Sequence, residues 1–229
     1  MNQGLVYTLN FSMPFKTSDN FSEVLSTLPV TVGASNNIAP VYYDGALLAN
    51  DGEFLSYGGL LKGSVAFSPP DADASLGYER YDYGGEGRKF SPGFVQSTLS
   101  AGVTRYVGYG AGVSVPSENK GYYFGGMQSK SRGPVYLPQG NVTTDPTIYS
   151  NDLVSVDMKT QLKEVWTKET IGKNVPDRAN PEVVWVPVGK NGVLVVVGGV
   201  INPVYANLSY TLTPTQMAQS VSLFILSSY

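Results

Sequence analysis

Acidic side chains at short spacings are the first places in this 229-residue sequence where chemistry could occur. Asp71, Asp73 and Ser75 stand at alternate positions, which is the opening spacing of a calcium-binding loop. Such a loop needs glycine at its sixth position and glutamate at its twelfth, where this sequence has Leu76 and Asp82. A solvated turn is therefore preferred to a calcium site.

A second acidic group, Glu79, Asp82 and Glu86, contains the residue types that glycosidases use as paired catalytic carboxylates. The tyrosine-rich stretch around them, "YERYDY" (78–83), favours a solvated strand over a catalytic pair. The chain also contains no histidine and no cysteine, which excludes an imidazole base, a thiolate nucleophile, disulfides and most zinc or copper sites. We therefore expect no catalytic residue, cofactor or metal in this chain, and predict that it is not an enzyme.

The charge balance limits the classes of partner. Fifteen Lys and Arg residues against 18 Asp and Glu give a net charge of −3, so nucleic acid is not an expected partner. No apolar stretch reaches the roughly 18 residues of a membrane span, and no signal-peptide pattern opens the chain; we expect no membrane insertion by this segment. Charged residues make up 14% of the chain, below the roughly 25% of an average globular protein, which favours an extracellular or cell-surface location over a cytoplasmic one.

Short strands joined by turns must position any functional side chain, because the chain is rich in glycine, tyrosine and proline. Three glycine pairs each end a run of aromatic and β-branched residues: Gly58-Gly59, Gly125-Gly126 and Gly198-Gly199. Glycine at the end of an inner strand permits positive φ and a close approach of neighbouring backbones. The other strands of each unit are predicted before and after these runs, at 39–49, 76–83, 104–115, 151–158, 162–168, 181–189 and 220–228.

One of these units carries the features of a known family. "GYYFGG" (121–126) is followed by "NDLVSVD" (151–157), by Trp166 and by "VPDR" (175–178), and this order resembles the Kelch repeat of the galactose oxidase/Kelch-like superfamily. The resemblance implies structural Kelch positions at Gly58, Gly59, Gly125, Gly126, Asp157, Trp166, Arg178, Gly198 and Gly199. The long insertions and abundant tyrosine are similar to secreted or cell-surface Kelch proteins of fungi, which would make the full-length protein a membrane-anchored glycoprotein.

The resemblance implies an all-β fold, a partial Kelch-type β-propeller with four-stranded antiparallel blades. Residues 1–229 would form one propeller segment, with complete blades at 39–100 and 104–170 and incomplete blades at 5–35 and 181–229. A propeller normally closes with four to eight blades, and open sheet edges invite pairing. The chain is therefore predicted to be a fragment of a longer propeller or to self-associate and so close the ring.

The long segments that follow the three glycine pairs, at about 60–75, 127–149 and 200–219, occupy the same place in each unit. Equivalent insertions in stacked repeats lie on one face, which is commonly the binding surface. We expect this face to recognise a protein or carbohydrate ligand through Lys62, Phe67, Lys130, Arg132, Tyr136 and Tyr205. Two alternatives stay open: a fragment of a galactose-oxidase-like enzyme whose catalytic residues are missing here, and an intracellular Kelch scaffold.

Four Asn-x-Ser/Thr sequons supply candidate glycosylation sites at Asn10, Asn20, Asn141 and Asn207. Two of them, Asn141 and Asn207, fall in segments after glycine pairs, where a glycan is easily accommodated. Glycosylation at these sites depends on secretion, so a cytoplasmic protein would carry none.

Overall fold

The computed structural model describes residues 6–9, 14–18, 20–28, 42–43, 45–62, 74–83, 87–90, 95–100, 102–128, 135–136, 148–160, 163–172, 175–201 and 221–225. Strands dominate these residues, and the only helical pieces within them are α1 (Phe21–Val24) and the 3₁₀ turn η1 (Pro116–Glu118). The expectation of an all-β protein is confirmed. None of the helices in the described part has the length and apolar character needed to cross a bilayer.

The first sheet is built on the run that ends at Gly58-Gly59. Its strands are β4 (Ala46–Ala49), β5 (Glu53–Tyr57), β7 (Ala74–Tyr83), β8 (Gly87–Phe90) and β9 (Val95–Thr98). All neighbours pair antiparallel in the order β4-β5-β7, and β8 and β9 then pair with opposite halves of β7. The predicted strand at 76–83 is therefore present and begins two residues earlier.

The second sheet is an antiparallel meander in the order β11-β12-β16-β17. Its strands are β11 (Ala111–Val115), β12 (Lys120–Phe124), β16 (Leu153–Asp157) and β17 (Val165–Glu169). The predicted single strand at 104–115 is divided, because Tyr109 adopts a φ of 56° and separates β11 from the short β10 (Val107–Gly108). The positive φ of a tyrosine is unusual, and no feature of the local sequence indicated it.

The third sheet has the order β18-β19-β20, with β18 (Arg178–Val186), β19 (Val193–Ile201) and β20 (Val221–Ile225). Here the glycine pair does not end its strand, because β19 continues through it to Ile201. The register steps from Ala179 opposite Val200 to Pro181 opposite Gly198. Asn180 and Gly199 stand opposite each other at the skipped position, and both have positive φ. The ladder is therefore interrupted there without a change of register.

Three small sheets accompany these large ones. β1 (Val6–Leu9) pairs with β2 (Leu25–Leu28), and β10 pairs with β13 (Met127–Gln128), which pairs in turn with β15 (Ile148–Tyr149). The remaining sheet joins β3 (Tyr42–Tyr43), β6 (Leu60–Lys62) and β14 (Val135–Tyr136), and its β6–β14 pair is parallel. No sheet among the described strands closes on itself.

The register shows that the three large sheets repeat one structural unit. In each sheet the residue just before the glycine pair lies opposite the first part of the preceding strand: Tyr57 opposite Ala46, Phe124 opposite Ala111, and Val197 opposite Glu182. The two residues after each pair also find equivalent partners, in β3, in β10 and at the start of β18. These register positions define which residues of the three units correspond.

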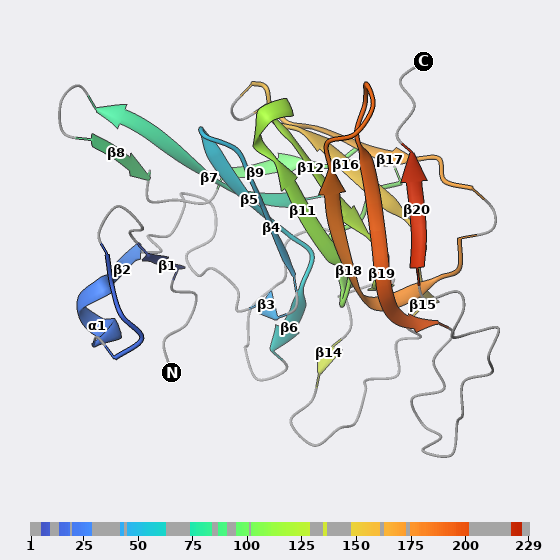
Figure 1. Cartoon of the computed structure of the whole chain (residues 1–229), viewed down its shortest axis with the longest axis horizontal. Helices are drawn as coiled ribbons and strands as arrows, with labels where there is room; N and C mark the ends of the chain where they lie inside the picture. Colours follow the sequence, from blue (N-terminus) through green and yellow to red (C-terminus); the bar gives the residue numbers. More distant parts are fainter. Residues whose placement is uncertain are drawn as a thin grey trace.

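The large sheets lie side by side, and β11 lies between β4 and β18 (Figure 1). One hydrophobic cluster fills the space between the first and second sheets, and it contains Leu48, Leu55, Tyr57, Tyr123, Val156 and Trp166 among others. A second cluster fills the space between the second and third sheets, and it contains Ala111, Tyr122, Phe124, Val183, Leu194 and Val196 among others. The second sheet is therefore buried on both faces.

Candidate binding end at the glycine pairs

Each large sheet has a glycine-pair end, defined by its glycine pair, and a hairpin-turn end, defined by residues 50–52, 116–119 and 187–192. The first glycine of each pair has a left-handed backbone, with φ of 70°, 72° and 68° at Gly58, Gly125 and Gly198. The second glycines follow at 102°, 95° and 85°. Only glycine adopts such values without strain, so the three units share one backbone turn at this end.

This turn brings consecutive sheets into hydrogen-bonding contact. The N–H of Gly59 donates to the carbonyl of Val107 at 2.7 Å, and the N–H of Gly126 donates to the carbonyl of Arg178 at 2.8 Å. A Cβ built on Gly58 would lie 2.5 Å from the Val107 oxygen, and one on Gly125 would lie 2.7 Å from the Arg178 oxygen. A side chain at either position would push the two sheets apart.

Arg178 connects two successive glycine pairs. Its backbone carbonyl accepts the bond from Gly126, while its guanidinium Nη1 donates to the carbonyl of Gly198 at 2.9 Å. The side chain is fully buried, and burial lowers the pKa of Arg178 from its usual value. The arginine that the Kelch resemblance singles out thus has a structural position between the second and third units.

A polar cluster surrounds the segment before β16. The Nε2 of Gln128 donates to Ser150 Oγ at 3.1 Å and to Asp152 Oδ2 at 2.8 Å, and Lys168 Nζ lies 2.8 Å from Asp152 Oδ1. Ser150 N–H donates to the Gly126 carbonyl at 2.9 Å. The Lys168 side chain is 45% exposed and that of Asp152 is 21% exposed, so part of this cluster is open to solvent at the glycine-pair end.

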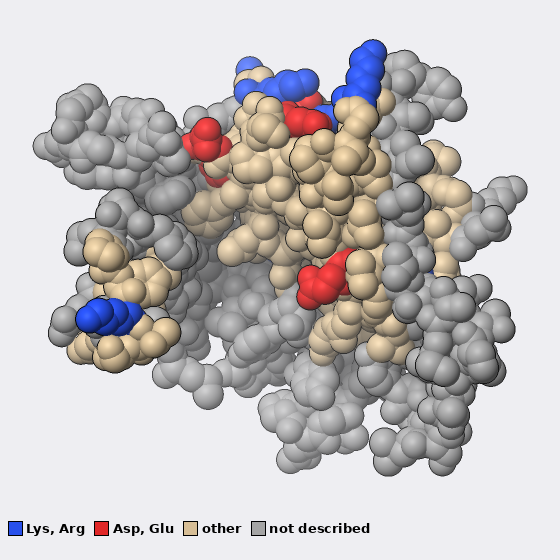
Figure 2. All heavy atoms as spheres, viewed as in Figure 1, with Lys and Arg blue, Asp and Glu red and all other residues tan. Residues whose placement is uncertain are grey.

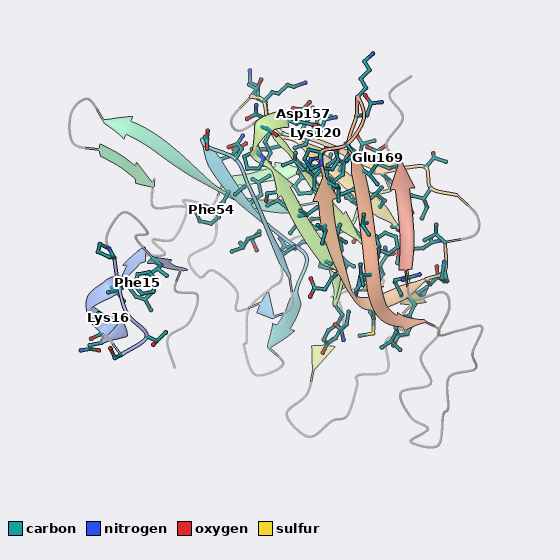
Figure 3. The ribbon with its side chains drawn as sticks, viewed as in Figure 1. Phe15, Lys16, Phe54, Lys120, Asp157 and Glu169 are labelled. Carbon is teal, nitrogen blue, oxygen red and sulfur yellow. The ribbon has the colours of Figure 1, made fainter. Side chains whose placement is uncertain are left out.

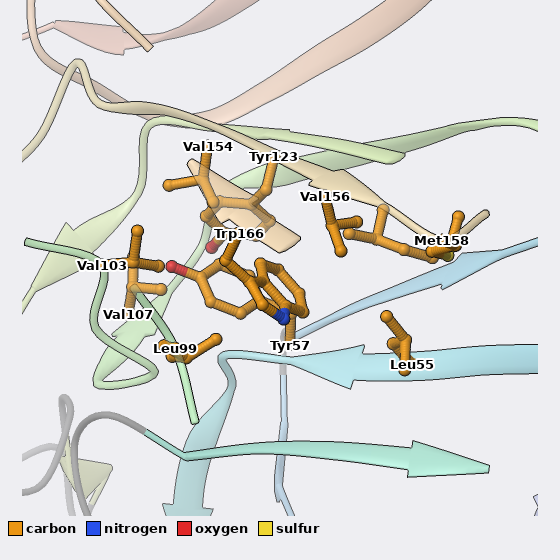
Figure 4. Packing of buried hydrophobic residues seen from close by; sticks show 11 residues of the cluster. Leu55, Tyr57, Leu99, Val103, Val107, Tyr123, Val154, Val156, Met158 and Trp166 are labelled. Carbon is orange, nitrogen blue, oxygen red and sulfur yellow. The ribbon is translucent and has the colours of Figure 1, made fainter. Parts of the chain in front are cut away.

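Aromatic side chains pack behind this cluster (Figure 4). The Tyr57 ring meets Tyr123 edge to face and stacks on Trp166, with both centroid distances at 4.9 Å. Its hydroxyl donates to the Thr104 carbonyl at 2.7 Å. Burial raises the pKa of Tyr57 well above its usual value, and Tyr123 and Asp152 add to the rise. The Tyr57 phenol therefore stays neutral at ordinary pH and serves packing.

The structure brings two predicted ligand-binding residues together. Tyr136 on β14 lies opposite Lys62 on β6 in the parallel pair, although the two are 74 positions apart in the sequence. The other predicted contact residues lie outside the described part of the chain: Phe67, Lys130, Arg132 and Tyr205. The segments after the first two glycine pairs therefore meet in one small sheet.

Other predicted residues have separate positions. Asp157 lies opposite Lys120 across β12 and β16 at the hairpin-turn end (Figure 3), and its side chain is 3.4 Å from Lys159 Nζ. Asn20 is exposed, and its side-chain oxygen accepts bonds from Ser22 N–H at 3.2 Å and Ser22 Oγ at 2.8 Å. The sequons at Asn10, Asn141 and Asn207 lie outside the described residues, as do Asp71, Asp73 and Glu86.

Sequence reasoning did not single out Arg105, Gln128 or Asp152. Arg105 is 2% exposed, and the local sequence does not distinguish a buried arginine from an exposed one. The Asn-Asp pair before β16 was noted only as the start of a strand, and its contact with Gln128 depends on the β13–β15 pairing. No cluster of three His, Cys, Asp or Glu residues that could hold a metal occurs among the described side chains.

Among the described residues, this end contains inter-sheet hydrogen bonds and a partly exposed ion pair between Lys168 and Asp152. No family model matches the chain, and no curated protein matches its sequence. What the chain does is therefore inferred from its own repeated geometry and side chains.

Proposed function

We propose that the three large sheets are consecutive blades of a Kelch-type β-propeller segment, and that the chain is a non-enzymatic binding module. Propeller blades are four-stranded antiparallel sheets arranged around an axis, and the second sheet has this strand order. The repeated register, the repeated glycine turn and the position of β11 between β4 and β18 support the same assignment.

The binding surface in this proposal consists of the segments after the glycine pairs. The β6–β14 pair is the observation that carries it, because it joins the segments from two different units in one sheet. Lys62 and Tyr136 occupy opposite register positions there. A lysine and a tyrosine supply a charge, hydrogen-bond donors and an apolar ring, residue types that suit a glycan or a protein loop. The exposed Asn20 sequon is consistent with an extracellular or cell-surface location.

A glycan array tests this proposal. The labelled chain is applied beside a Lys62→Ala/Tyr136→Ala variant and a control, Lys190→Ala, which removes an exposed lysine at the hairpin-turn end. We expect the wild-type chain and the control to bind the same glycans and the double variant to bind about ten-fold more weakly or not at all. Glycan binding that survives the double substitution places the site elsewhere, and an array without binding rejects glycan recognition.

A further inference from the structure

The outer face of the third sheet corresponds to a face that is covered in the second sheet. Val113, Tyr122 and Phe124 of the second sheet point toward the third sheet and pack with its residues. The register positions that correspond to them in the third sheet are Val184, Val195 and Val197. Val184 is 50% exposed and Val197 is 42% exposed. Figure 2 shows mainly uncharged side chains over β18 and β19, interrupted by one acidic patch, with lysine and arginine gathered at the hairpin-turn end.

Gly198 indicates what kind of neighbour this face accommodates. At Gly58 and Gly125 the left-handed turn makes room for a carbonyl of the next sheet, which lies within 2.7 Å of a built Cβ. Gly198 has the same φ of 68°, yet no described atom lies within 4 Å of a Cβ built on it. The third unit therefore has the turn that receives a following sheet but no described sheet in that place.

The first sheet presents the complementary surface. Leu47 on β4 is 62% exposed, and its register equivalents are Gly112 in β11 and Val183 in β18. Both equivalents pack against the sheet before their own: Gly112 lies against Ala46 and Leu48, and Val183 belongs to the cluster shared with the second sheet. The face of the first sheet around Leu47 thus corresponds to the faces of the second and third sheets that pack against the sheet before them.

We propose that two copies of this chain associate head to tail, with the Leu47 face of each copy on the Val184 and Val197 face of the other. This inference rests on the proposed identity of the sheets as propeller blades. The contact joins two different surfaces, so it is heterologous, and it ends in a closed ring only if the rotation fits. Two copies bring six large sheets together, within the four to eight that close a propeller.

The repeated geometry predicts which residues meet across this contact. A Cβ built on Gly112 lies 2.6 Å from Ala46 Cβ and 3.1 Å from Leu48 Cδ2. The equivalents of Ala46 and Leu48 in the third sheet are Glu182 and Val184. Leu47 of the second copy therefore lies against Glu182 and Val184. Leu47 has a side chain where Gly112 has none, so its Cβ must lie further from the facing strand than the Cβ built on Gly112. The expected distance between the Cβ atoms of Leu47 and Glu182 therefore approaches the roughly 3.5–4.5 Å that separates the Cβ atoms of a disulfide.

Cysteine cross-linking tests the pairing directly, because the natural chain has no cysteine. The variant Leu47→Cys/Glu182→Cys is oxidised and separated on a non-reducing gel. We expect most of it to run as a covalent dimer. The matched control is Leu47→Cys/Val165→Cys, whose second cysteine replaces an exposed valine on β17, away from the open faces. Cross-linking no greater than in this control overturns the proposal.

Sedimentation velocity supplies a second measurement that needs no cysteine. The wild-type chain is expected to form dimers, and Val184→Glu is expected to weaken them more than about ten-fold, because a second carboxylate would be brought into the contact on the same face as Glu182. Val165→Glu is expected to leave the dimer unchanged. A wild-type chain that stays monomeric at all concentrations refutes the association. Such a chain that still binds glycans through Lys62 and Tyr136 leaves the proposed function intact, so the two failures are distinguishable.

Discussion

Replacing Gly125 and Gly198 separately by alanine distinguishes the two roles of the glycine pairs. Both positions have nearly the same left-handed φ, 72° and 68°, so alanine costs about 1–2 kcal/mol of backbone strain at either one. At Gly198 no further described contact is affected. At Gly125 the new Cβ would lie 2.7 Å from the Arg178 carbonyl, which accepts the Gly126 hydrogen bond at 2.8 Å.

The additional cost at Gly125 has two parts. Weakening the bond from Gly126 to Arg178 removes about 0.5–1.5 kcal/mol, and moving the backbone to relieve the overlap costs about 1–3 kcal/mol. With the strain included, Gly125→Ala is expected to lower the free energy of unfolding by roughly 3–6 kcal/mol. Gly198→Ala is expected to lower it by about 1–2 kcal/mol.

Urea unfolding followed by tryptophan fluorescence measures both losses. Trp166 reports on the cluster between the first and second sheets, and Trp185 stacks on Tyr122 with ring centroids 5.8 Å apart. The protein is kept dilute, so that association does not contribute to stability. Equal losses in the two variants would refute the steric role of the Arg178 carbonyl and leave backbone strain as the only cost. Gly58→Ala, whose Cβ would lie 2.5 Å from a carbonyl, is expected to behave like Gly125→Ala.

Three further predictions concern side chains. Arg178→Met is expected to cost about 2–4 kcal/mol in the same urea assay, because it removes a buried guanidinium and its hydrogen bond to the Gly198 carbonyl. A loss under about 1 kcal/mol would contradict the role assigned to the guanidinium. Burial, followed by Glu118 and Glu169, raises the pKa of Tyr122 to about 12, so the folded chain holds this proton more tightly than the unfolded chain. The stability that this proton contributes is complete below pH 10 and is lost as the pH rises toward 12. Over that interval the free energy of unfolding should fall less steeply with pH in Tyr122→Phe than in the wild-type chain. An equal fall in the two proteins would contradict this cause. Lys168→Ala should cost less than about 1 kcal/mol, because the ion pair with Asp152 is partly exposed, and a larger loss by urea unfolding would show that the pair is structural.

The strand pattern could be predicted from sequence where it depends on neighbouring residues. The runs before the glycine pairs formed β5, β12 and β19, because aromatic and β-branched residues favour strands and the intervening turns are short. The break at Tyr109 could not be predicted, because its carbonyl accepts a bond from Asn180 N–H at 2.7 Å in the next unit. A contact between residues 71 positions apart has no local sequence signal.

The candidate binding end was predictable only in outline. Equivalent insertions predict a shared face, and the β6–β14 pair joins parts of two of the segments in one sheet. The parallel pairing itself had no signal, because β14 has two residues and lies within a long polar stretch. Burial of Arg105 and Arg178 was also hidden, since a buried arginine is identified by what surrounds it in space.

Hydrogen bonds at both ends of the large sheets connect the first two units. At the hairpin-turn end, Asn50 Nδ2 donates to Asn119 Oδ1 at 3.1 Å and to the Met158 carbonyl at 2.9 Å, which joins the first two sheets. At the other end the first sheet is joined to β10, which precedes the second sheet in the chain, by the bond from Gly59 to Val107. Both connections use residues outside the long segments that follow the glycine pairs. Substitutions in those segments therefore leave these two connections between sheets in place, and under the proposed binding function the segments could change while the glycines and the buried side chains preserve the large sheets.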